Sequence, residues 1–280
     1  MATRSAPKRP TALITGASSG IGEALAHACA RAGFNLVLVA RSVDTLRRLA
    51  RQLAREHDIQ AWAAPTDLAL EGAAQQLAAN MQRARRPIDL LVNNAGVLEH
   101  GRFVDMPAQR HRELIRLNVE ALTDMLAAFV PPMVVRGHGR VLNVASIAAF
   151  QPVPSLATYA ATKAYVLSLT ESLAEELQGT GVSVTALCPG ITATAMLDKA
   201  AQADGRLGAL PAFVVGSADA VAEEGLQACL RAAVICVPGT LNRAATLAGR
   251  ATPRWLVRRV GGAVARRLSA RGDCPPPPHH

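Results

Sequence analysis

The sequence predicts an α/β fold, with one domain built on a doubly wound parallel sheet of about seven strands. Short apolar runs alternate with longer segments of helical periodicity, and this alternation is typical of a parallel sheet covered by helices on both faces. The chain has 280 residues, half of them hydrophobic, and α/β folds of this length often form one undivided domain.

The boundaries of the elements follow from the apolar runs and from the glycine, proline and polar residues that end them. Strands are expected at 11–15, 35–40, 60–64, 88–92, 140–146, 182–188 and 233–237. Helices are expected at 23–32, 43–56, 70–85, 107–129, 156–178 and 219–231. Asn118 lies beside the apolar stripe of the helix at 107–129, either as a satisfied core polar group or as a break in the helical ladder.

A glycine-rich turn, with Gly16, Gly20 and Gly22, joins the first strand to the first helix. This arrangement brings backbone N–H groups and a helix N-terminus up to a phosphate, and a side chain there would hold a pyrophosphate away. The spacing G-x-x-x-G-x-G differs from the general G-x-G-x-x-G fingerprint. An ordinary strand-to-helix turn therefore remains the alternative when the turn is considered alone.

The second strand of such a unit ends beside the adenosine ribose, where an acidic residue would bind the 2′-hydroxyl. This chain has Arg41 and Ser42 there, and a guanidinium suits a 2′-phosphate. Arg41 could instead simply begin the polar helix that follows. Asp67, after the third strand, could cap the next helix, accept a hydrogen bond from adenine, or do neither.

Tyr159 and Lys163 share one face of the helix at 156–178. A nearby ammonium stabilises a phenolate and a bound pyridinium would add to this effect, and lowering the tyrosine pKa from ~10 to ~7 takes about 4 kcal/mol. Such a tyrosine exchanges a proton with an alcohol or ketone near neutral pH. Ser146, at the end of the fifth strand, could bind the same oxygen, and Asn118 could hold a relay water behind Lys163. Y-x-x-x-K also arises by chance, so the argument depends on the joint order of these residues with the glycine turn.

Taken together, these motifs resemble those of the classical short-chain dehydrogenase/reductase family, in its order and at its spacings, over roughly residues 10–240. The matching positions are Thr15 to Gly22, Asp67, Asn93 to Gly96, Asn118, Ser146, Tyr159, Lys163, Pro189, Gly190, Thr192 and Thr194. The resemblance implies a Rossmann-type fold and hydride transfer between NAD(P)(H) and an alcohol or carbonyl. It implies a catalytic tetrad of Asn118, Ser146, Tyr159 and Lys163.

The resemblance also implies a cofactor site, in which Lys163 binds the nicotinamide ribose while Thr192 and the backbone of Ile191 bind the carboxamide. An Arg-Ser pair at 41–42 implies NADP(H) rather than NAD(H). The full cofactor-binding set is Gly16, Ser18, Ser19, Gly20, Ile21, Gly22, Arg41, Ser42, Asp67, Asn94, Ala95, Gly96, Lys163, Pro189, Gly190, Ile191, Thr192 and Thr194.

The predicted function is an NADP(H)-dependent carbonyl reductase or alcohol dehydrogenase for an apolar ketone, a 3-oxoacyl compound or a steroid-like molecule. A non-catalytic NADP-binding regulatory protein is the alternative, although a sensor needs only the glycines and Arg41. The segment 195–216 is expected to form a lid within the catalytic domain at 11–242. Apolar surface on the helices at 107–129 and 156–178 predicts a homodimer or homotetramer, and the family usually pairs through these helices.

Charge is uneven along the chain. From Arg243 onward there are eight arginines and one acid, giving +7, whereas the remaining 22 basic and 20 acidic residues give +2. No nucleic-acid motif accompanies this basic, proline-ended extension at 243–280, so no nucleic-acid partner is predicted. Its segment from Thr252 to Arg271 could form a helix that makes weak contact with an anionic membrane, although docking on the enzyme body is favoured.

The termini and cysteines predict the compartment. Residues 1–10 are polar and are expected to be a flexible N-terminus without a signal sequence, and no apolar run reaches the ~18 residues of a membrane span. The five cysteines are scattered without metal-ligand spacing. They predict reduced thiols in a cytoplasmic protein that holds no metal.

Overall fold

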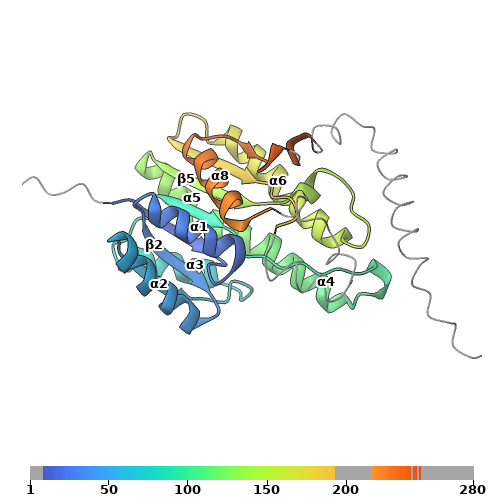
Figure 1. Cartoon of the computed structure of the whole chain (residues 1–280), viewed down its shortest axis with the longest axis horizontal. Coiled ribbons are helices and arrows are strands. Elements are labelled where there is room, and N and C mark those ends of the chain that lie inside the picture. Colours follow the sequence, from blue (N-terminus) through green and yellow to red (C-terminus); the bar gives the residue numbers. More distant parts are fainter. Residues whose placement is uncertain (1–8, 193–215, 241, 245, 247–280) are drawn as a thin grey trace, which may run out of the picture.

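The computed structural model describes residues 9–192, 216–240, 242–244 and 246. Within them, seven parallel strands form one sheet in the order β3-β2-β1-β4-β5-β6-β7 (Figure 1). The strands are β1 Thr11–Thr15, β2 Asn35–Ala40, β3 Ala61–Pro65, β4 Leu90–Asn93, β5 Gly139–Val144, β6 Val182–Leu187 and β7 Ile235–Cys236. The prediction of a doubly wound, Rossmann-type parallel sheet in a single domain is confirmed.

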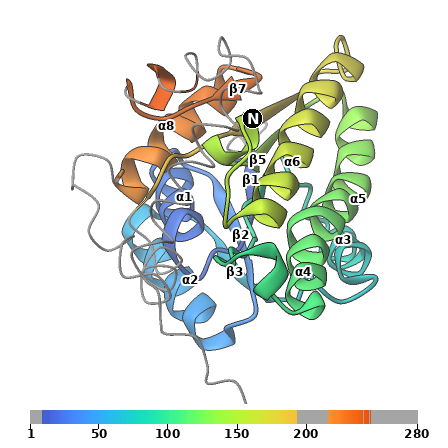
Figure 2. The same ribbon diagram turned by 90° about the vertical axis from the view of Figure 1, so that its right-hand side faces the viewer.

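Helices cover both faces of the sheet (Figure 2). On one face lie α1 Gly20–Arg31, α2 Val43–His57 and α8 Ala218–Leu230, which share one apolar core with the sheet. On the other face α3 Ala73–Arg83, α5 Ala121–Arg136 and α6 Ala157–Glu176 share a second core. The central strands are buried on both faces, which is why they appear in the sequence as continuous apolar runs.

The predicted strand boundaries agree with the structure to within two residues. The predicted starts of two helices were three residues off: α1 begins inside the glycine turn at Gly20 instead of at residue 23, and α3 begins at Ala73 instead of at residue 70. Gly72, with φ 73°, is the N-cap of α3. Asp67 therefore does not cap that helix, and this alternative is wrong.

The long helix expected at 107–129 is present but runs further, over 108–136, and it is not α-helical throughout. The chain forms α4 Ala108–Ile115, a π-helical turn η2 Arg116–Glu120, and then α5, which continues to Arg136 with two proline residues, Pro131 and Pro132, inside it. By length and composition the stretch 108–136 could cross a membrane, since an 18-residue window within it has a mean hydropathy of 1.2. However, 44% of that window is buried in the fold, and core helices meet the same criterion.

A buried polar network connects two central strands to α6. Asn93 Nδ2 on β4 donates to Asn143 Oδ1 on β5 at 3.0 Å, and these two residues are partners in the strand register. Asn143 Nδ2 donates in turn to Thr170 Oγ1 on α6 at 2.9 Å. The network ties the sheet to the helix that carries Tyr159 and Lys163.

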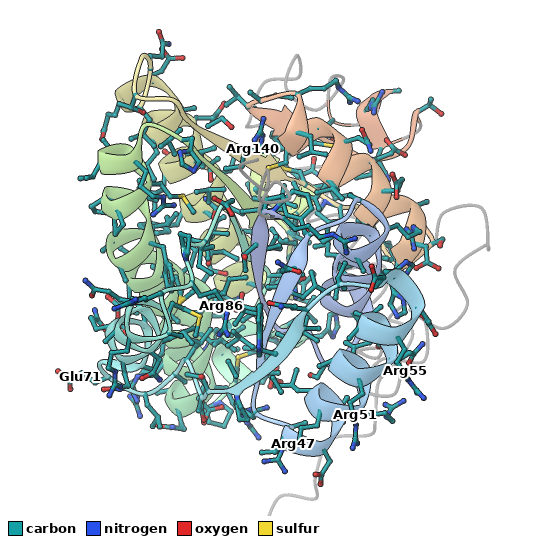
Figure 3. The ribbon with its side chains drawn as sticks, turned by 90° about the vertical axis from the view of Figure 1, so that its left-hand side faces the viewer. Arg47, Arg51, Arg55, Glu71, Arg86 and Arg140 are labelled. Carbon is teal, nitrogen blue, oxygen red and sulfur yellow. The ribbon has the colours of Figure 1, made fainter. Side chains whose placement is uncertain are left out.

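The outer surface near the sheet edge is basic. Arg47, Arg51 and Arg55 follow one another on α2 at intervals of four residues and are exposed (Figure 3). None of them has an ion-pair partner in the part of the chain that the structure describes. Trp62 lies on the edge strand β3, and the Arg86 guanidinium is 3.4 Å from the centre of its ring.

Candidate active site

The candidate site lies at the C-terminal strand ends, where the strand order reverses between β1 and β4. Open parallel sheets bind their ligands at such a switch point. The glycine turn after β1 meets the segment after β4 at this place. Asn94 Nδ2 donates to the carbonyls of Thr15 and Gly16 at 2.9 and 3.3 Å, and Thr15 Oγ1 accepts from the Asn94 and Ala95 N–H groups.

The backbone conformation and the close packing of the turn require glycine at three positions. Gly16 and Gly20 have φ angles of 66° and 59°, which favour glycine. A Cβ on Gly22 would overlap the Gly16 carbonyl and Asn94 Nδ2. Ser19 is the N-cap of α1 but makes no side-chain cap bond. The first N–H groups of α1 therefore stay available to an anion, and this fits a pyrophosphate.

Residues predicted to bind the adenosine end lie after β2 and β3. Arg41 and Ser42 are both exposed, and Arg41 forms no ion pair with any other described residue. Asp67 Oδ1 accepts a hydrogen bond from the Ala69 N–H at 3.1 Å. This local bond leaves the second carboxylate oxygen of Asp67 available, so the adenine interpretation stays a prediction.

Asn118 lies in the π-helical turn η2, so both alternatives for it hold together. Its Oδ1 accepts from the Val97 N–H at 2.9 Å, and its Nδ2 donates to the Val97 carbonyl at 2.9 Å and to Thr162 Oγ1 at 3.2 Å. A Cβ on Gly96 would lie 3.1 Å from Asn118 Oδ1 and 3.6 Å from Lys163 Nζ. Gly96 therefore keeps open a space that both polar groups face.

Ser146 follows β5 and caps a short 3₁₀ helix, η3 Ile147–Phe150. Its Oγ accepts from the Ala148 N–H at 3.1 Å, and it lies close enough to the Tyr159 phenol to lower the pKa of that group. The N–H of the next residue, Ile147, donates to the Pro189 carbonyl at 3.0 Å. Ser146 thus lies between Tyr159 and the loop that leaves β6.

Lys163 is buried one turn after Tyr159 on α6. Its Nζ donates to the Val144 carbonyl at 2.8 Å and lies 5.8 Å from the centre of the Tyr159 ring. Loss of water around the ammonium lowers the pKa of Lys163 to about 8.

Burial of the phenol raises the pKa of Tyr159 above its usual value, and Ser146 offsets only part of this effect. Lys163 is not among the groups that alter it. The expected lowering by Lys163 is therefore not provided by the described residues, because desolvation dominates in this enclosed position.

The loop after β6 holds four more predicted residues. Pro189, Gly190, Ile191 and Thr192 follow β6 at the same sheet edge, and the Ile191 carbonyl accepts from the Gly216 N–H at 2.8 Å. Thr194, nearly all of the lid segment 195–216, residues 1–8 and most of the basic extension lie outside the described residues.

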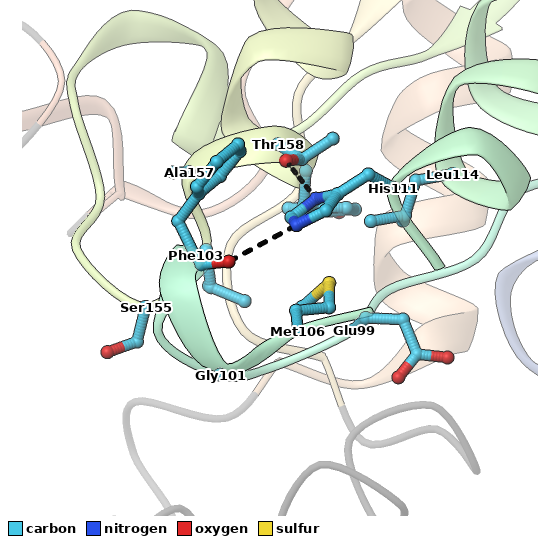
Figure 4. Close-up of a pocket in the computed structure, with 11 residues that line it drawn as sticks. Glu99, Gly101, Phe103, Met106, His111, Leu114, Ser155, Ala157 and Thr158 are labelled. Carbon is cyan, nitrogen blue, oxygen red and sulfur yellow. Dashed lines mark hydrogen bonds between the residues drawn. The ribbon is translucent and has the colours of Figure 1, made fainter. Parts of the chain in front are cut away.

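The sequence did not predict a role for His111, because this residue lies in a polar stretch that contains no motif. Figure 4 shows it in a small pocket, with Nδ1 2.7 Å from Thr158 Oγ1 and Nε2 3.4 Å from the Phe103 carbonyl. Tyr159 also lines this pocket. A carbonyl oxygen only accepts, so the neutral ring carries its hydrogen on Nε2. His111 therefore ties the loop around Phe103 to the residue that precedes Tyr159.

Comparisons with known proteins agree with this geometry. A family model described as short chain dehydrogenase matches residues 10–205. Oxidoreductase UcpA from Salmonella typhimurium is 37% identical over 194 residues, which cover 69% of this chain and 73% of that protein.

Solved structures agree as well. A short-chain dehydrogenase from Sphingobium yanoikuyae in complex with NADPH has a TM-score of 0.74 and 32% identity, covering 97% of this chain and 98% of its own. The bulky-bulky ketone specific alcohol dehydrogenase from Comamonas testosteroni has a TM-score of 0.72 and 31% identity, covering 88% and 95%. Among the described residues, no three His, Cys, Asp or Glu side chains gather as metal ligands would.

Proposed function

Because this chain belongs to the short-chain dehydrogenase/reductase family of oxidoreductases, we propose that it is an NADP(H)-dependent carbonyl reductase or alcohol dehydrogenase. Its catalytic residues are Asn118, Ser146, Tyr159 and Lys163. The observation that supports this assignment most strongly is the position of Ser146 beside the Tyr159 phenol, whose pKa it lowers, with the buried ammonium of Lys163 one helical turn further along α6.

The nicotinamide cofactor supplies the hydride in reduction and accepts it in oxidation. The chain itself handles the proton and the oxygen. In reduction, Tyr159 donates its phenolic proton to the substrate oxygen, while Ser146 donates a hydrogen bond to the same atom. The raised pKa of Tyr159 keeps the phenol protonated at neutral pH, which suits the acid role. Lys163 and Asn118 face the space over Gly96, where a relay water would return the proton.

The pyrophosphate of the cofactor binds at the uncapped N-terminus of α1 and the glycine turn. Arg41 and Ser42 receive the 2′-phosphate, since an exposed guanidinium without a partner among the described residues is available for it. NADP(H) is therefore favoured over NAD(H), in keeping with the NADPH bound to the Sphingobium protein. Asp67 lies on the adenine side, and Thr192 with the Ile191 backbone lies on the carboxamide side.

The substrate is an apolar ketone or a 3-oxoacyl compound. The small pocket beside Tyr159 has an apolar part, formed by Phe103, Met106 and Leu156, which supports an apolar ligand next to the phenol. Its remaining lining includes the polar side chains of Glu99, His111, Ser155 and Thr158. The Comamonas neighbour is likewise described as specific for bulky ketones.

The protein acts as a homo-oligomer. An open groove of about 350 Å³ is lined by residues of η1 Phe103–Asp105, α4, η2 and α6, among them Phe103 and Ile115. Phe103 is 61% exposed and Ile115 41% exposed, and apolar patches of this kind mark interaction surfaces. The four described cysteines are free and buried, which supports a cytoplasmic location.

The test is turnover of NADPH and NADH with a panel of apolar ketones and 3-oxoacyl thioesters, run with Tyr159→Phe in parallel. The variant should bind NADPH as the wild type does but lose nearly all turnover, because the proton donor is gone. Retention of more than a small fraction of kcat at saturating substrate would remove the mechanism. NADPH binding without turnover of any tested substrate by the wild type would favour the regulatory alternative.

A further inference from the structure

Position 190 holds a glycine because the side chain of Asn242, 52 residues later in the sequence, packs against it. The φ of Gly190 is not in the left-handed region, so backbone strain does not demand glycine there. A Cβ at Gly190 would lie 2.5 Å from Asn242 Nδ2, 2.7 Å from its Oδ1 and 2.8 Å from its Cγ. The side chain of Asn242 therefore occupies the space that any larger residue at position 190 would need.

Asn242 is itself held in place after β7. Its Nδ2 donates to the Pro238 carbonyl at 3.0 Å. The next residue, Arg243, donates from Nε to the Val237 carbonyl at 2.8 Å and pairs with Glu224 Oε2 on α8 at 3.0 Å. These bonds fasten the segment that carries Asn242 to the body of the domain.

The loop that Asn242 contacts is connected to the catalytic residues on its other side. The Pro189 carbonyl accepts from the Ile147 N–H at 3.0 Å, next to Ser146. Thr192 Oγ1 donates to the Gly190 carbonyl at 3.0 Å. The loop from Pro189 to Thr192 thus lies between the Ser146 segment and Asn242, and it is also bonded to the Gly216 N–H through the Ile191 carbonyl.

We propose that Asn242 is a positioning residue for the nicotinamide end of the cofactor. Its side chain packs against Gly190 and holds the Pro189–Thr192 loop where Ile191 and Thr192 meet the carboxamide. This inference depends on the proposed function for the identity of the cofactor. Asn242 itself acts through Gly190 and does not touch the reacting atoms.

The first experiment measures two equilibrium dissociation constants for Asn242→Ala, one for NADPH and one for adenosine 2′,5′-bisphosphate, which lacks the nicotinamide. NADPH should bind about 3- to 10-fold more weakly, the effect of losing one well-placed contact. The bisphosphate should bind as it does to the wild type. Asn80→Ala is the matched control, since Asn80 is exposed on α3, and it should change neither constant.

The second experiment adds Gly190→Ala in both backgrounds. In the wild-type background the new methyl group collides with Asn242 and should weaken the binding of NADPH. In the Asn242→Ala background the three colliding atoms are gone, so Gly190→Ala should reduce the affinity for NADPH several-fold less than it does in the wild-type background. This difference separates a collision with Asn242 from a collision with the cofactor, which would persist in both backgrounds.

Three results would overturn the inference: equal weakening of both ligands by Asn242→Ala, unchanged NADPH binding in that variant, or an equal cost of Gly190→Ala in the two backgrounds. Loss of bisphosphate binding through unfolding counts as the first result, because Asn242 would then support the fold as a whole. If the wild type binds the bisphosphate but shows no additional affinity for NADPH, the proposed function fails instead.

Discussion

Lys163 is a buried ammonium, and its replacement by methionine should stabilise the protein while abolishing activity. Keeping this group protonated at pH 7 with a pKa of about 8 instead of 10.5 costs about 3 kcal/mol. Methionine is of similar length and apolar, but it leaves the Val144 carbonyl without its donor, which costs about 1 kcal/mol. The free energy of unfolding of Lys163→Met should therefore exceed that of the wild type by about 2 kcal/mol.

The pH dependence gives the prediction a sign. The folded pKa of Lys163 lies below the unfolded one, so between about pH 8 and 10.5 the unfolded state binds more protons. The wild type therefore gains stability relative to the variant as pH rises through this window. Below pH 8 both states are protonated and the full cost is present. The advantage of Lys163→Met should fall from about 2 kcal/mol at pH 7 to near zero at pH 9.5.

Urea unfolding followed by circular dichroism at pH 7, 8, 9 and 9.5 measures these differences. Arg48→Met is the matched control, because Arg48 is exposed on α2 and its loss should change stability by less than about 0.5 kcal/mol. A wild type at least as stable as Lys163→Met at pH 7 would refute the reasoning. So would an advantage that does not shrink with rising pH.

Two further predictions follow from the exposed residues. Arg41→Ala should weaken the binding of NADPH by roughly 10- to 100-fold and barely change the binding of NADH, because only NADPH has the 2′-phosphate that the guanidinium binds. Titration of both cofactors against both proteins measures this difference, and equal wild-type affinity for the two cofactors would contradict it. In sedimentation at micromolar concentration the wild type should exceed the 29.3 kDa of one chain, and Ile115→Glu should shift it toward that mass by placing a charge in the apolar groove; a wild type already at 29.3 kDa would end the oligomer proposal.

The strands could be predicted from the sequence because buried parallel strands are continuous apolar runs with sharp ends. A break at Asn118 was one of two alternatives that the sequence offered. The form of the break could not be predicted, since the π-helical turn is accompanied by bonds to Val97, a residue on another segment. The left-handed backbone of Gly72, the N-cap of α3, makes this helix begin later than its periodicity indicates.

The candidate site divides in the same way. Tyr159 and Lys163 were found through their spacing on one helix, but the rise of the Tyr159 pKa through burial could not be predicted, because desolvation depends on what surrounds the phenol. His111 and Asn242 carry no motif at all. Their roles come from contacts with Thr158 and Gly190, and only the folded chain brings those residues together.

The paired amides of Asn93 and Asn143 have a consequence for how the chain folds. Strands β4 and β5 are apolar on both faces, so a slip of one residue would still bury hydrophobic side chains, and hydrophobicity alone distinguishes such registers poorly. After a slip, however, each amide would face an apolar neighbour and lose its hydrogen bond inside the core. The pair therefore selects against misaligned sheets during folding, and replacing both residues by valine should increase misfolded or aggregated product even where the native sheet tolerates the change.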